Sequence, residues 1–115
     1  MKKLILLAFI SISTHSLAGV EFICSLKHLK PVVQVAKNHS SYDKNLHCSV
    51  SCMLTRRCHS KEVLLVGYLK EFKDLLGSGN AERADIEADM YGISLVKHKR
   101  ALTDKECLTQ CDLRY

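Results

Sequence analysis

The chain has 115 residues, of which 25% are charged and 47% hydrophobic, and its formal net charge is +5. This length suffices for one domain with a modest core and is too short for two. Without the two lysines of the export signal described below, the charge falls to +3. This weak balance argues against a nucleic-acid partner. The one basic cluster, at residues 97–100, has no interleaved aromatic side chains, so we expect a solvated connector there.

The first eighteen residues have the three parts of a secretory signal peptide. Two lysines form the basic start, an apolar run covers residues 4–12, and Ser16-Leu17-Ala18 is a small-residue cleavage site. Cleavage at this site leaves a single disulfide-rich helical domain at 19–115. The apolar run is far shorter than the roughly 20 residues that span a bilayer, and Gly19 stands where a lipid-anchored protein would have cysteine. We therefore predict a periplasmic or secreted protein without a transmembrane span in its mature form.

Six cysteines lie in the predicted mature chain, and an even number in a short exported protein is typical of a disulfide framework. They are Cys24, Cys48, Cys52, Cys58, Cys107 and Cys111. Cysteines four residues apart lie on one helix face, and two such helices packed antiparallel can be joined by two bridges. Among fifteen possible pairings, we favour Cys48 with Cys111, Cys52 with Cys107 and, by elimination, Cys24 with Cys58. A zinc site of Cys48, Cys52, Cys58 and His59 is the competing interpretation.

Helical periodicity dominates the mature sequence. A helical stripe begins at residue 43, further helices are expected at 61–76 and 81–91, and a capping box at 103–106 begins the last one. In 19–41, valines that favour a strand are mixed with apolar residues at helical spacing, so this segment fits either an extended or a helical structure. We predict a mainly α fold, a small bundle of about four helices stapled by three disulfides.

Acidic and imidazole side chains fall on the predicted inward faces of three of these helices. His47 lies on the first helix, Glu71 and Asp74 lie three residues apart on the second, and Asp85 and Asp89 lie four apart on the third. The face of the third helix that carries these carboxylates otherwise holds alanine and glycine, which indicate that another helix approaches closely. We therefore expect the five side chains to converge between the helices.

The order and spacing of these residues resemble the pattern of a known family. The three segments are Asp43 to His47 (DKNLH), Gly67 to Asp74 (GYLKEFKD) and Asp85 to Gly92 (DIEADMYG). They follow the ordered pattern DK-x2-H, G-x2-KE-x2-D, D-x2-AD-x2-G, which is similar to that of YfiM-like envelope lipoproteins and, more loosely, of VanZ-like membrane proteins. The resemblance covers residues 43–92. It implies a cell-envelope role, without specifying a reaction, and marks the positions His47, Glu71, Asp74, Asp85 and Asp89.

One imidazole among several carboxylates can serve three purposes. The five marked side chains can bind a divalent cation through nitrogen and oxygen ligands. Alternatively, His47 and Glu71 can act as an acid–base pair oriented by acidic neighbours. The group can also be a buried ion-pair network that a lysine such as Lys44 neutralises and that fixes the helix register. The sequence does not decide among these purposes or whether the chain is an enzyme.

The predicted function is that of an exported cell-envelope protein, most simply a small binding, interaction or accessory domain that carries the His/Glu/Asp cluster. Its partner would be another envelope protein or an envelope component. Two alternatives stay open. A metal-dependent or acid/base hydrolase acting on an envelope component needs the cluster to face a cleft, whereas an inhibitor or immunity-type protein of another envelope protein needs only a surface. Whether His47 faces a cavity discriminates between these classes.

Overall fold

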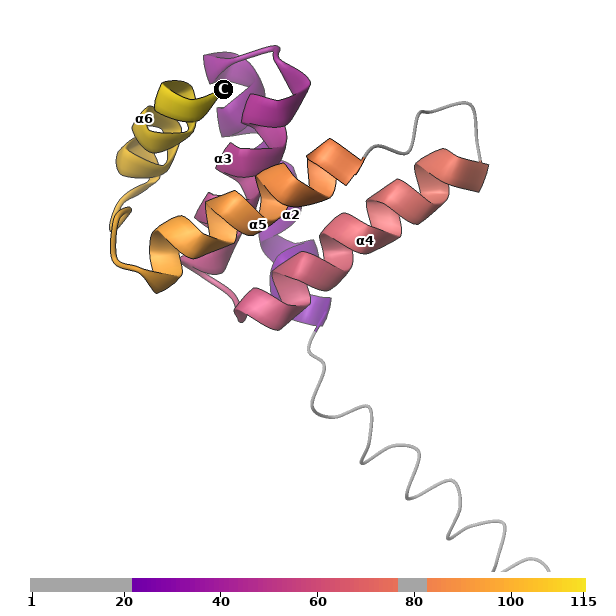
Figure 1. The fold of residues 1–115 in the computed structure, drawn as a ribbon. Coiled ribbons are helices and arrows are strands. Elements are labelled where there is room, and N and C mark those ends of the chain that lie inside the picture. The colour runs from indigo at the N-terminus through magenta and orange to yellow at the C-terminus, as the bar shows by residue number, and fades with distance from the viewer. Residues whose placement is uncertain (1–21, 77–82) are drawn as a thin grey trace, which may run out of the picture.

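A computed structural model describes the chain at residues 22–76 and 83–115, and the predicted export signal at 1–18 lies outside these ranges. The described part consists of helices and their connections, which confirms the mainly α fold (Figure 1). None of its helices is both long enough and apolar enough to cross a lipid bilayer.

Five helices make up this part of the chain. They are α2 (Phe22–His39), α3 (Asp43–Thr55), α4 (Ser60–Leu76), α5 (Arg83–Lys97) and α6 (Asp104–Arg114). About four were predicted, and the additional helix is α2, which forms from the segment that fitted two structures. Helix α5 continues to Lys97, beyond the predicted end at Tyr91, while its predicted beginning at residue 81 lies outside the described ranges.

Helix α2 has one buried face and one exposed face, and its valines are divided between them. Val32 and Ala36 are buried four residues apart, whereas Val35 is 45% exposed. This is the spacing of one apolar helix stripe rather than the alternation of a strand. Pro31 lies inside the helix and costs it one backbone hydrogen bond, because proline has no N–H group. Packing of the buried stripe therefore outweighs both the strand preference of valine and the proline.

Helix α3 is the centre of the bundle, since it packs against each of the other four helices. Its buried residues are Asn45, His47, Cys48, Ser49, Ser51, Cys52, Met53 and Leu54. They surround the helix axis, as expected for a helix that is enclosed by neighbours. The polar ones among them require hydrogen-bond partners from the surrounding helices, and this requirement shapes the site described below.

Helix α5 approaches α3 very closely at Gly92. A Cβ atom at this position would lie 2.2 Å from the carbonyl oxygen of Cys48 and 3.0 Å from the backbone nitrogen of Cys52. Only glycine permits this distance, and the expectation that small residues on this face indicate a close helix contact is confirmed. The approach brings Asp85 and Asp89, which lie earlier on the same face of α5, against α3.

Three disulfides staple the bundle in the pairing favoured from the cysteine spacing. Cys48–Cys111 and Cys52–Cys107 join α3 to α6, and Cys24–Cys58 joins α2 to the connection that follows α3. Their Cα–Cα distances of 5.7 to 5.8 Å are usual for disulfides. No cysteine is left free, so the interpretation as a zinc site with thiolate ligands is wrong.

The predicted capping box begins the last helix. The Oγ1 atom of Thr103 accepts a hydrogen bond from the backbone N–H of Glu106 over 3.1 Å, and the Glu106 carboxylate accepts one from the backbone N–H of Leu102 over 3.0 Å. Two of the otherwise unpaired amides near the beginning of α6 are satisfied in this way. The cap fixes where α6 begins, and therefore where its two cysteines meet α3.

Candidate functional site

The structure brings three of the five predicted site residues together. His47 on α3 is 7% exposed, and Asp85 and Asp89 on α5 are each 2% exposed. Glu71 and Asp74 fall in α4, but their side chains lie outside the described part of the structure. Their participation stays a prediction, and the site is built here from the residues of α3 and α5.

The imidazole of His47 is held by the carboxylate of Asp89. The Nδ1 atom lies 2.9 Å from Oδ1 of Asp89, and the same oxygen accepts a hydrogen bond from the Ser51 hydroxyl over 2.8 Å. We assign the hydrogen of this contact to Nδ1, because the same carboxylate oxygen acts as the acceptor toward Ser51. Ser51 was not predicted as a site residue. Its position four residues after His47, on the same helix face, is the signal that could have identified it.

The opposite ring nitrogen of His47 faces two further carboxylates. Its Nε2 atom lies 3.6 Å from Oδ2 of Asp85 and 3.8 Å from Oδ1 of Asp43. Asp43 was not among the predicted site residues, although it belongs to the DK-x2-H segment and lies one helical turn before His47. The side chain of Asp43 is 58% exposed, whereas that of His47 is 7% exposed. The ligand atoms of Asp43, His47 and Asp85 lie within 4.8 Å of one another, close enough to hold a metal ion.

Lys44 supplies the positive charge that the ion-pair interpretation required. Its Nζ atom donates a hydrogen bond of 2.6 Å to Oδ1 of Asp85 and lies 3.5 Å from Oδ2 of Asp43. Burial opposes ionisation of Asp85, but this hydrogen bond and the nearby charges of His47 and Lys44 hold the pKa of Asp85 below its ordinary value. Asp85 is therefore an ionised carboxylate at neutral pH.

Asp89 has one satisfied oxygen and one without a partner. Its Oδ2 atom is buried and makes no hydrogen bond with the described residues. A Cβ atom at Gly67 of α4 would lie 2.4 Å from this oxygen, so the absence of a side chain at Gly67 makes room for the carboxylate. Leaving a buried carboxylate oxygen unpaired costs free energy. A buried polar atom without a hydrogen-bond partner therefore requires an explanation, such as a strained surrounding structure or a bound ligand.

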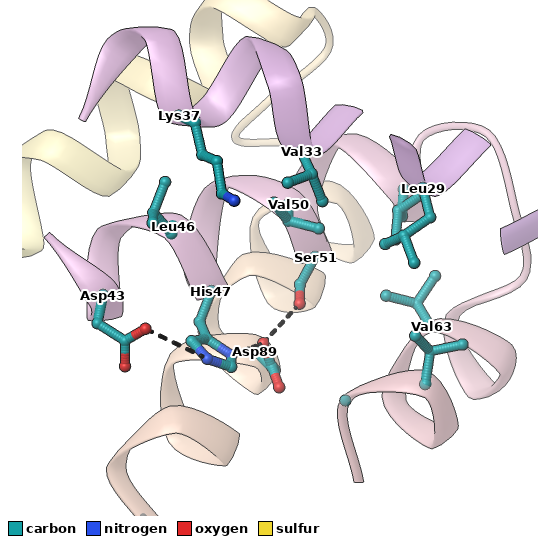
Figure 2. A pocket seen from close by; sticks show the side chains of 13 residues that line it. Leu29, Val33, Lys37, Asp43, Leu46, His47, Val50, Ser51, Val63 and Asp89 are labelled. Carbon is teal, nitrogen blue, oxygen red and sulfur yellow. Dashed lines mark hydrogen bonds and ion pairs between the residues drawn. The ribbon is translucent and has the colours of Figure 1, made fainter. Parts of the chain in front are cut away.

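A cavity of about 340 Å³ opens beside this cluster, between α2, α3 and α4, and Asp89 of α5 also lines it. Figure 2 shows the polar side chains of His47, Ser51 and Asp89 at one end, while Leu29, Val33 and Val63 lie at the other. This volume lies within the roughly 300–1,000 Å³ that is usual for small-molecule sites. The cluster therefore borders a cavity, as the ligand-binding and hydrolase interpretations require.

A second histidine–aspartate pair lies on the surface, away from the cavity. The Nε2 atom of His39 is 2.7 Å from Oδ2 of Asp112, and the Asn45 amide donates a hydrogen bond of 2.8 Å to Oδ1 of Asp112. The contact with His39 is the main reason that the pKa of Asp112 lies below its ordinary value, and the Asn45 hydrogen bond adds to the effect. This pair ties α2 and α3 to α6.

Comparison with protein-family models, with curated proteins and with solved structures found no match to this chain. The resemblance to YfiM-like proteins therefore stays a prediction. The function has to be argued from the geometry of the site.

Proposed function

We propose that the protein is an exported binding domain of the cell envelope that holds an amphipathic small molecule in the cavity beside His47. One observation carries this proposal: the cavity has mostly apolar walls and one polar end. An apolar cavity with a few converging polar groups is the usual form of a small-molecule site. The family resemblance over residues 43–92 agrees with an envelope role but assigns no ligand.

Two features support a location outside the cytoplasm. All six cysteines are paired in three disulfides, and such bonds persist in oxidising compartments. The sequence at 1–18 also has the composition of an export signal. A periplasmic or secreted domain is consistent with both features.

The cavity favours a ligand with an apolar body and one polar head group. Side chains such as Leu46, Val50 and Val63 form its walls, and burying apolar ligand surface against them is favourable by about 25 cal/mol per Å². At the other end, His47, Ser51 and Asp89 offer hydrogen-bonding groups to a head group. A lipid or lipid fragment of the envelope has this chemistry.

Filling the cavity tests the proposal. The mature protein is titrated with a neutral, environment-sensitive apolar fluorophore. Val33→Phe places a larger side chain in the cavity, whereas Val35→Phe makes the same change two residues later on α2, where the side chain is 45% exposed and does not line the cavity. We expect Val33→Phe to weaken binding by about tenfold or more, the scale of about 1.4 kcal/mol, and Val35→Phe to leave it unchanged. Absence of saturable binding, or an equal loss in both variants, would contradict the proposal.

A second candidate function is acid–base hydrolysis of such a ligand. The pairing of His47 Nδ1 with a buried carboxylate favours it, because a general base is oriented in this way. Ser51 donates its hydrogen bond to Asp89 and not to the imidazole, so water rather than Ser51 would be the nucleophile. A His47→Gln variant that still binds the fluorophore but loses hydrolysis of an ester amphiphile would support this candidate. Absence of hydrolysis by the wild-type protein would leave binding as the function.

A further inference from the structure

Three ligand-type atoms lie close together on the Nε2 side of His47. They are Oδ1 of Asp43, Nε2 of His47 and Oδ2 of Asp85. Asp43 and His47 are one turn apart on α3, and Asp85 comes from the neighbouring α5. Two packed helices therefore fix the relative positions of all three.

The distances from Nε2 of His47 to the carboxylates of Asp43 and Asp85 are compatible with a shared ion. The separations of 3.6 Å and 3.8 Å from Nε2 to the two carboxylate oxygens are longer than normal hydrogen bonds. Two ligand atoms that bind one tetrahedral ion at about 2.0–2.2 Å lie about 3.3–3.6 Å apart. Movements of a few tenths of an ångström, which the exposed Asp43 can make, would complete such a site.

The surrounding groups are those that usually support a bound metal ion. Asp89 accepts the hydrogen bond from Nδ1, which directs Nε2 toward the carboxylates, and Lys44 donates to the other oxygen of Asp85. The Oδ2 atom of Asp89 lies next to Gly67 and lacks a hydrogen-bond partner among the described residues. Among the described residues, the carboxylates of Asp43, Asp85 and Asp89 adjoin the imidazole. The ammonium group of Lys44 contacts those of Asp43 and Asp85. Imidazole and carboxylate groups are both ligands that divalent transition-metal ions accept.

We propose that Asp43, His47 and Asp85 bind one divalent cation of the zinc class, with Asp89 and Lys44 as supporting groups. One imidazole and two carboxylates suit zinc, which accepts three protein ligands and a water molecule, whereas Ca²⁺ and Mg²⁺ take oxygen ligands only. Compared with the metal set predicted from the sequence, Asp43 is added and Asp89 becomes a supporting group, while the side chains of Glu71 and Asp74 lie outside the described part of the structure. Asp43 and His47 also line the cavity, but all three proposed metal ligands come from the protein, so the cation site does not require the amphipathic ligand.

Zinc binding is measured by equilibrium dialysis of the untagged, oxidised mature protein, and coordination by the visible absorption of Co²⁺ in place of Zn²⁺. The variants are Asp43→Asn and His47→Gln. The matched control is His39→Gln, which removes the imidazole of the surface pair with Asp112. We expect one ion per chain, affinity lowered by about tenfold or more in Asp43→Asn, lost in His47→Gln and unchanged in His39→Gln.

The Asp43 variant decides the outcome even if His47→Gln fails to fold, because the Asp43 side chain is mostly exposed. Circular dichroism and a count of intact disulfides establish that it is folded. Absence of stoichiometric zinc in the wild type would overturn the proposal. So would zinc affinity that is unchanged in Asp43→Asn, or an equal loss of affinity in His39→Gln. Fluorophore binding is measured separately, so a failure of the cavity proposal remains distinguishable from a failure of the cation site.

Discussion

The Nδ1 atom of His47 lies 2.9 Å from Oδ1 of Asp89, although the two residues are 42 positions apart in the chain. Both side chains are buried, and the contact joins α3 to α5 where Gly92 lets the two helices approach most closely. A contact of this kind is part of the packing and part of the candidate site at once. Its removal should therefore show which role dominates.

We predict that His47→Ala destabilises the metal-free protein by about 3–5 kcal/mol, because the buried carboxylate of Asp89 loses the imidazole and keeps only the hydrogen bond from Ser51. The measurement is urea unfolding at neutral pH. His39→Ala is the control and should cost at most about 1 kcal/mol, since its pair with Asp112 is exposed. A neutral or stabilising His47→Ala, accompanied by loss of ligand binding, would instead indicate a site strained for function.

Gly92→Ala should destabilise the protein by about 1–3 kcal/mol, because the added methyl group meets the backbone of α3, which cannot move aside as a flexible side chain can. Helix propensity alone predicts the opposite, a gain of about 1 kcal/mol. Glu87→Ala, on an exposed face of the same helix, should change stability by no more than about 0.5 kcal/mol. Thermal unfolding of both variants tests the prediction, and a stabilised Gly92→Ala would show that the helices are farther apart than described.

Gly67→Ala should also be destabilising, but through Asp89, because the new Cβ atom would lie 2.4 Å from its Oδ2. The same change in an Asp89→Ala background should then be neutral or stabilising, as expected for alanine in an open helix position. The two effects are compared in a double-mutant cycle by urea unfolding, with an expected coupling of about 1–3 kcal/mol. Additive effects would mean that Gly67 and Asp89 do not touch.

Acidification should weaken the link between α6 and the rest of the bundle. The pKa of folded Asp112 lies below its ordinary value, mainly because of the hydrogen bond with His39. The resulting stabilisation is complete above the unfolded pKa of about 3.9 and is lost as the pH falls through the lower folded pKa. Asp112→Asn should therefore flatten the dependence of unfolding free energy on pH in this acid range. An unchanged slope would mean that Asp112 titrates normally.

The architecture was largely predictable because its signals are local. The two Cys-x3-Cys spacings predicted both bridges between α3 and α6, and Thr103 with Glu106 predicted where α6 begins. Helix α2 was not predictable in the same way. Its valines and Pro31 disfavour a helix locally, and only the burial of Val32 and Ala36 against other helices decides its structure.

The candidate site was predictable in part, because helical spacing places residues on a face but does not give distances between helices. His47, Asp85 and Asp89 were expected to converge, and they do. Asp43 and Ser51 were missed, since their roles depend on how far α5 reaches along α3. The cavity was also not predictable, because its walls come from four helices, α2 to α5, whose relative positions the sequence pattern does not contain.

Mild reduction should open the Cys24–Cys58 disulfide first. Both of its cysteines are only partly buried, whereas the four cysteines between α3 and α6 are fully buried, and exchange requires a thiolate to reach the sulfur atom. Limited reduction, alkylation and mass mapping should therefore label Cys24 and Cys58 before the others. Loss of this bridge should cost about 2–5 kcal/mol while the bridges between α3 and α6 stay intact. Earlier labelling of Cys52 or Cys107 would show that the contact between α3 and α6 opens more readily than its burial implies.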